Sequence, residues 1–260
     1  MKSSFVAKVL FGLVAISAFL TMGCDPDDPV SSRQGGTDVT DPFPWAKSTT
    51  STYGAFSISA RTATSGSTTY LSGGKLYSDS NHSSAASGGQ MTAGDLTVNH
   101  NSDFGYLSAG QPTFGAMSTW ALAGDATNGI PAFTDSMYVP AVVVMSLPTT
   151  PGSTLSKGSG FTIQWNTDAN NDTVVVGFRY DMATSNYVDT SLSDSEYGWF
   201  RLVPDNGSYT IPSSALDSVP VGGYIDVIVA RGASKLSGTS TRKFHIYGTT
   251  MANGLFKVTS

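Results

Sequence analysis

The residues best suited to ligand binding lie close together between positions 180 and 200. Three aromatic residues and two aspartates make up this group: Tyr187, Asp189, Asp194, Tyr197 and Trp199. Aromatic rings beside short polar acceptors can stack on a sugar and hydrogen-bond its hydroxyls, which suits a glycan-binding site. The alternative is that some of these rings face a protein core. Side chains alternate along a strand, so Tyr197 and Trp199 would share one side and Phe200 would take the other.

A second group of polar residues has the spacing of a calcium loop. Asp168, Asn170 and Asp172 place side-chain oxygens at its first, third and fifth positions. The sixth position is Thr173 instead of glycine and the twelfth is Arg179 instead of glutamate, so the sharp turn and the bidentate ligand of an EF-hand are missing. A polar turn between two strands explains the same residues, and we expect no metal and no other cofactor.

The remaining titratable residues do not suggest catalysis. His82 and His100 lie in polar, loop-like contexts, and His245 alternates with apolar neighbours, so it should point outward from a strand. The sequence contains no nucleophile elbow, phosphate-binding loop or paired-cysteine metal motif. Carboxylates that could serve glycoside hydrolysis lie within 181–196, a stretch with the character of a solvated loop. We expect no catalytic residues, and a hydrolase is the third and least favoured function.

The only cysteine, Cys24, follows an apolar block at the N-terminus. Lys2 and Lys8 precede the 14 residues 9–22, and an acidic, proline-rich run begins immediately after the cysteine. A transmembrane helix needs about 20 apolar residues. The shorter block, preceded by lysines, fits the apolar region of a signal peptide.

The sequence Met22-Gly23-Cys24 at the end of this block resembles a lipobox, where bacterial lipoprotein signal peptides are cleaved. The resemblance implies that residues 1–23 are removed and that Cys24 is acylated, for example with palmitate. The folded part would then lie outside the cytoplasm, lipid-anchored to the inner or outer membrane of the cell envelope. Thr21 stands where a lipobox usually has leucine, so an ordinary secretory signal cleaved nearby remains the alternative.

The charge balance argues against a nucleic-acid partner. Residues 24–260 contain 12 basic and 19 acidic residues, a net charge of −7 with no basic stripe to neutralise phosphates. Five of the aspartates lie in 25–44, so the folded part is nearly neutral. A single cysteine also excludes an intramolecular disulfide, so stability must come from packing.

Composition and hydrophobic pattern together predict an all-β protein. Glutamate occurs once while serine, threonine and glycine abound, which disfavours helices. Residues 24–44 contain four prolines and few large apolar side chains, which predicts a disordered linker after the lipidated cysteine. Short strand-like runs between turns then predict a β-rich module over 45–148. Two prolines within 147–152 mark a boundary, and a module with sharper alternation follows over 149–260.

Two runs in this last module, Phe161-Thr162-Ile163-Gln164-Trp165 and the sequence GSYTIPSSAL at 207–216, are similar to Ig-like modules of uncharacterised exported bacterial proteins. The resemblance implies an Ig-like sandwich over 149–248, with Trp165 as the buried tryptophan of a central strand. We therefore expect two β-sandwich modules, the C-terminal one Ig-like. Fold analogy alone does not give a function. We expect a structural or interaction protein with a protein or glycan partner in the envelope, and a glycan-binding protein as the alternative.

Overall fold

The computed structural model describes residues 37–39, 41–47, 52–102, 105–108, 110–148, 152–185 and 198–260, all within one compact unit that spans 32–260. The regular structure of the described residues is nearly all β, with strands in several sheets, which confirms the expected all-β, sandwich-like fold. Its helical segments are short: η1 (Pro44–Ala46), α2 (Met182–Ser185) and η2 (Ser213–Leu216). Within the described ranges, no helix is both long and apolar enough to span a bilayer.

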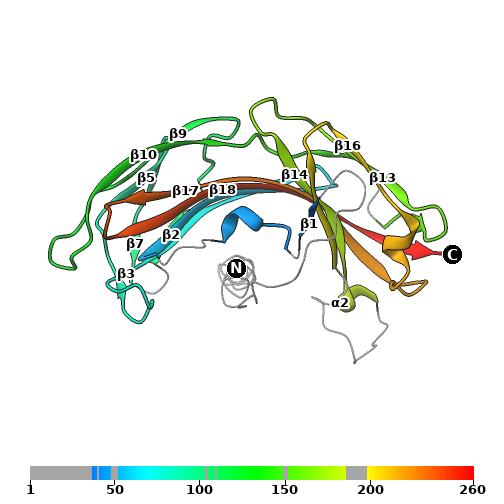
Figure 1. Ribbon diagram of the computed structural model, residues 1–260, viewed down its shortest axis with the longest axis horizontal. Helices are drawn as coiled ribbons and strands as arrows, with labels where there is room; N and C mark the ends of the chain where they lie inside the picture. The colour runs from blue at the N-terminus through cyan, green and yellow to red at the C-terminus, as the bar shows by residue number, and fades with distance from the viewer. Residues whose placement is uncertain are drawn as a thin grey trace, which may run out of the picture. The chain divides into compact units, whose positions relative to one another are not determined.

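An 11-stranded sheet forms the frame of the molecule (Figure 1). Its main path has the order β1-β15-β14-β17-β18-β2-β3-β8-β7, with β12 joined to β18 and β4 joined to β3. The strands are β1 (Thr37–Asp38), β2 (Gly54–Ala63), β3 (Thr68–Tyr77), β4 (Ala85–Ala86), β7 (His100–Asn101), β8 (Gly105–Ser108), β12 (Thr154–Ser156), β14 (Thr173–Tyr180), β15 (Gly198–Pro204), β17 (Tyr224–Gly238) and β18 (Lys243–Thr259). The long antiparallel β17–β18 hairpin lies at the centre of this path and is paired along its whole length.

Two smaller sheets lie over the same side of the β17–β18 hairpin, one toward each end of it (Figure 1). The four-stranded sheet has the order β10-β9-β5-β6 and comprises β5 (Met91–Ala93), β6 (Leu96–Val98), β9 (Ala116–Leu122) and β10 (Phe133–Val139). The three-stranded sheet has the order β11-β13-β16 and comprises β11 (Met145–Leu147), β13 (Phe161–Trp165) and β16 (Ser208–Ile211). Each small sheet closes a sandwich against the large one.

The two sandwiches enclose separate apolar cores. The first core lies under the four-stranded sheet, and its largest buried side chains are Phe56, Tyr106, Trp120 and Phe244. The second core lies under the three-stranded sheet and includes Ile163, Trp165, Phe178 and Phe256. Trp165 is 5% exposed and lies on the middle strand of its sheet, as the Ig-like resemblance implied.

The two expected modules share one continuous sheet. Strand β18 supplies Phe244 and Ile246 to the first core and Ala252 and Phe256 to the second, while its N-terminal half also pairs in parallel with β2. Backbone hydrogen bonds of one sheet therefore connect the two cores. Two modules were expected because of the prolines within 147–152, a local signal that carries no information on the pairing of β2 with β18.

The end of the stretch expected to be a disordered linker is ordered in the structure. We call residues 37–39 and 41–47 the strap. It begins with β1 on the edge of β15, and Trp45 in η1 lies directly over Gly232 of β17. A Cβ at position 232 would lie 1.8 Å from Nε1 of Trp45, so the ring needs a glycine beneath it. Val39, Phe43 and Trp45 thereby help to cover a third apolar cluster, which includes Val175, Phe200, Ile228 and Ala230.

Candidate functional site

Five of the residues singled out in the sequence lie outside the described part of the chain. These are Cys24 and four members of the candidate ligand site: Tyr187, Asp189, Asp194 and Tyr197. Only Trp199, the fifth member, is described.

The ring of Trp199 is half-buried on β15 at the margin of the second core. Its centroid lies 6.3 Å from that of Phe178 in a stacked arrangement and 6.2 Å from that of Tyr209. The guanidinium carbon of Arg201 lies 5.1 Å from the same centroid, and Arg201 Nη2 is 2.7 Å from Asp38 Oδ1 on the strap. Trp199 therefore both stabilises the core and retains an exposed portion beside an ion pair.

Asp168 in the calcium-like stretch is engaged by protein donors. Its carboxylate accepts hydrogen bonds from the Tyr138 hydroxyl and the Ala141 amide, each at 2.7 Å, and from the Asn170 amide at 3.1 Å. Burial raises the pKa of Asp168, but these hydrogen bonds outweigh burial and lower it overall. Asp168 thus fixes the segment after β10. Within the ranges that the structure describes, no three His, Cys, Asp or Glu side chains are grouped so as to hold a metal ion.

The three histidines occupy three different settings. His82 stacks on Tyr77 at 4.4 Å, and its Nε2 lies 2.7 Å from the carbonyl oxygen of Thr52. His100 meets the ring of Tyr106 edge-on. We expected His245 to point outward from its strand. Its side chain does face away from the first core, but the residue is only 4% exposed, so the expected exposure was wrong. This burial lowers the pKa of His245.

The most deeply buried charges form a structural ion pair between Arg231 and Asp205. Arg231 Nε lies 2.6 Å from Asp205 Oδ2, and the two side chains are 0% and 1% exposed. Trp165 donates its indole N–H to Asp205 Oδ1 at 2.7 Å, and Arg231 also donates to the carbonyl oxygens of Ala141 and Asn166. The network joins β17 to the segment that precedes β11 and to the turns that follow β13 and β15.

A row of polar side chains crosses four neighbouring strands of the large sheet, on the face that is turned away from the two cores. Arg179 Nη2 on β14 lies 3.2 Å from Asp226 Oδ2 on β17. Asn253 on β18 donates to Asp226 Oδ1 at 2.7 Å, and its own side-chain oxygen accepts from Arg61 Nε on β2 at 2.8 Å. We call Arg179, Asp226, Asn253 and Arg61 the polar ladder. Asp226 is 6% exposed, and burial raises its pKa although Asn253 and Arg179 act against this.

The polar ladder ends at a shallow depression of about 390 Å³ beside the β2–β3 turn. Its lining consists of Arg61, Ala63, Thr64, Ser65, Ser67, Thr69, Asn253, Gly254 and Leu255. Arg61 is exposed, and among the described residues only Asn253 accepts a hydrogen bond from it. The depression can therefore offer a positive charge and several hydroxyl groups to a ligand that carries acceptors.

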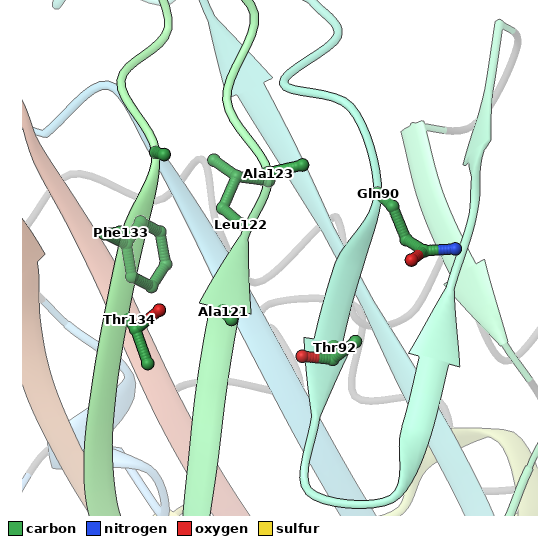
Figure 2. A pocket seen from close by; sticks show the side chains of 8 residues that line it. Gln90, Thr92, Ala121, Leu122, Ala123, Phe133 and Thr134 are labelled. Carbon is green, nitrogen blue, oxygen red and sulfur yellow. The ribbon is translucent and has the colours of Figure 1, made fainter.

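A second depression of about 530 Å³ lies on the outer face of the four-stranded sheet. Figure 2 shows its lining on three adjacent strands, where Thr92, Ala121 and Thr134 lie side by side in register. The remaining lining residues are Gln90, Leu122, Ala123, Ala132 and Phe133. None of these eight side chains is charged, so this depression offers less chemistry than the first.

The sequence analysis missed the polar ladder because its members are far apart in the chain. Arg61 and Asn253 are separated by 192 positions and meet only because β2 pairs with β18. One local signal was present, namely the single charged residue Asp226 within the apolar run 225–230. Comparison of the chain with protein-family models, curated proteins and solved structures gave no match.

Proposed function

We propose that this chain is a lipid-anchored, non-enzymatic lipoprotein of the bacterial cell envelope that acts as a structural or interaction module. The observation that carries the proposal is Met22-Gly23-Cys24, placed between an apolar block with preceding lysines and an acidic run. The anchor would hold the protein on the inner or outer membrane with its folded part outside the cytoplasm. Its partner would be a protein or a glycan of the envelope, with no nucleic acid and no cofactor involved.

The folded unit supports a binding role more readily than a chemical one. Its open depressions are lined largely by strand residues, and sites on strands are held more precisely than sites on loops. The buried Arg231–Asp205 pair and its hydrogen bonds hold several segments of this frame together. A rigid β-frame with shallow, polar surface sites suits recognition of an exposed polymer.

Replacing Cys24 with serine is expected to abolish fatty-acid incorporation and to move the protein from the membrane fraction to the soluble fraction. The physical reason is that the acyl chains supply the membrane affinity, at about 0.8 kcal/mol per buried CH₂ group. The measurement is labelling with radioactive palmitate, together with fractionation of the native host.

A matched control is Thr21→Leu, which brings the leader closer to the lipobox pattern and should leave labelling intact. The proposal fails if the wild-type protein takes up no label. It also fails if the Cys24→Ser protein remains in the membrane fraction through an uncleaved leader, because the leader itself would then be the anchor.

A glycan-binding surface protein is the second candidate, and the position of Trp199 favours it. The half-buried ring lies beside Tyr209 and next to the Arg201–Asp38 pair, so an apolar surface and charged groups occur together. Tyr187, Asp189, Asp194 and Tyr197 complete this candidate site in the sequence.

If Trp199 is the platform, Trp199→Ala should weaken glycan binding at least tenfold, because the ring area that a sugar would cover is lost. The measurement is a glycan array followed by titration of the best ligand, with circular dichroism to show that the variant folds. Trp165→Phe is the control, since it alters a buried ring and should leave binding unchanged. Equal binding by Trp199→Ala and the wild-type protein would rule out the platform.

A further inference from the structure

We propose that the depression beside Arg61 binds the carboxylate of an acidic sugar. The inference is separate from lipid anchoring and from the Trp199 site, because it rests on the polar ladder and on the β2–β3 turn. It would give the proposed interaction module a ligand of defined chemistry.

The polar ladder orients the side chain of Arg61. Its Nε donates to Asn253, and Asn253 is itself held by the buried carboxylate of Asp226. With Nε occupied, the two terminal amino groups of Arg61 remain as a fork, and no acceptor for them is found in the described part of the chain. A guanidinium fork matches a carboxylate through two parallel hydrogen bonds. Because the polar ladder already orders the side chain, binding loses less conformational entropy.

The polar ladder as a whole carries a positive charge. It contains two arginines, Arg61 and Arg179, and one acidic residue, Asp226, so the net charge of the ladder is positive whether or not Asp226 is ionised. Arg179 is paired with Asp226 at 3.2 Å, whereas Arg61 lines the depression. A ligand with one negative charge therefore fits this site better than a neutral one.

The lining of the depression distinguishes a sugar from a membrane surface. Thr64, Ser65, Ser67 and Thr69 line it together with Arg61, and their hydroxyl groups can exchange hydrogen bonds with sugar hydroxyls. A Cβ at Gly254 would lie 2.5 Å from Cγ2 of Thr64, so this glycine lets the turn approach β18 and form a wall. Attraction to anionic lipid amounts to about 1 kcal/mol per basic residue and needs a cluster of them. Arg61 is the only basic residue in the lining.

The test is a titration of the purified full-length chain with sodium glucuronate at constant ionic strength, followed by NMR of the arginine Nε–H signals. We expect saturable binding that shifts the Arg61 signal, and at least tenfold weaker binding of glucose, which lacks the carboxylate. Arg61→Gln should weaken glucuronate binding at least tenfold. Arg61→Lys should also bind more weakly than the wild-type chain, because it keeps the charge but loses the fork.

The matched control is Lys75→Gln, which removes one exposed positive charge from the same face of the sheet, on β3 and outside the depression. This variant should bind glucuronate like the wild-type chain. Equal losses in Lys75→Gln and Arg61→Gln would show general electrostatic attraction and overturn the site. No saturation by about 10 mM glucuronate, or full binding by Arg61→Gln, would also overturn it. Arg61-dependent binding to phosphatidylglycerol vesicles without glucuronate binding would assign the site to a membrane instead.

Discussion

Replacing Arg231 with methionine is expected to lower the free energy of unfolding by about 3–5 kcal/mol, the range found when one partner of a buried ion pair is removed. The side chain is 0% exposed, and Asp205 beside it is 1% exposed, so the variant would leave a carboxylate in the interior without its counter-ion. The carbonyl oxygens of Ala141 and Asn166 would each lose a donor as well. Urea unfolding followed by circular dichroism measures the loss as a lower midpoint at unchanged slope.

An exposed ion pair on the same strand provides the control. Lys235 Nζ lies 2.5 Å from Asp135 Oδ1, with 44% and 26% of the two side chains exposed. Lys235→Met should therefore cost no more than about 1 kcal/mol. The double variant Arg231→Met/Asp205→Leu should recover part of the loss, because it removes the stranded carboxylate. A loss below about 1 kcal/mol for Arg231→Met would contradict the structural role of the pair.

Trp165→Ala is expected to be similarly costly, at about 3–5 kcal/mol, because it leaves a large cavity in the second core. Trp165 is 5% exposed, and its indole also donates to Asp205, the partner of Arg231. Trp165→Phe keeps much of the ring volume and loses the hydrogen bond, so its cost should be clearly smaller. The same urea experiment gives both values.

Trp165 and Arg231 should also behave non-additively. Both side chains contact Asp205, and residues that share a partner usually show a coupling energy of about 0.5–3 kcal/mol in a double-mutant cycle. A Trp165→Ala loss below about 1 kcal/mol would place the ring outside the core. Strict additivity with Arg231→Met would show that the two groups do not act through Asp205.

The sequence was informative wherever a prediction depended on apolar and polar residues alternating along a strand. The pattern Phe161, Ile163 and Trp165 identified a strand, and the structure places Ile163 and Trp165 in the second core. For His245 the same alternation predicted the correct face of β18, but it did not predict that the residue is buried on that face. Alternation reports which way a side chain points relative to its neighbours and does not report what covers it.

The strap shows a different limit. Proline and aspartate in residues 24–44 predicted a disordered linker, yet Val39 and Phe43 lie on the large sheet. Burial of a few apolar side chains is enough to order a short segment when a surface of matching shape is present. The glycine that receives Trp45 is Gly232, almost 190 positions further along the chain, so composition around the strap could not reveal it.

What the sequence determined by itself was the all-β class and the strand that places Ile163 and Trp165 on one face, because both depend on neighbouring residues. The tertiary structure alone decided that one sheet runs through both sandwiches and that Arg61, Asn253, Asp226 and Arg179 join into the polar ladder. Strand pairing caused both outcomes. Hydrogen bonds between strands bring together residues as far apart as Arg61 and Asn253, which are 192 positions apart, and no local periodicity specifies which strands become neighbours.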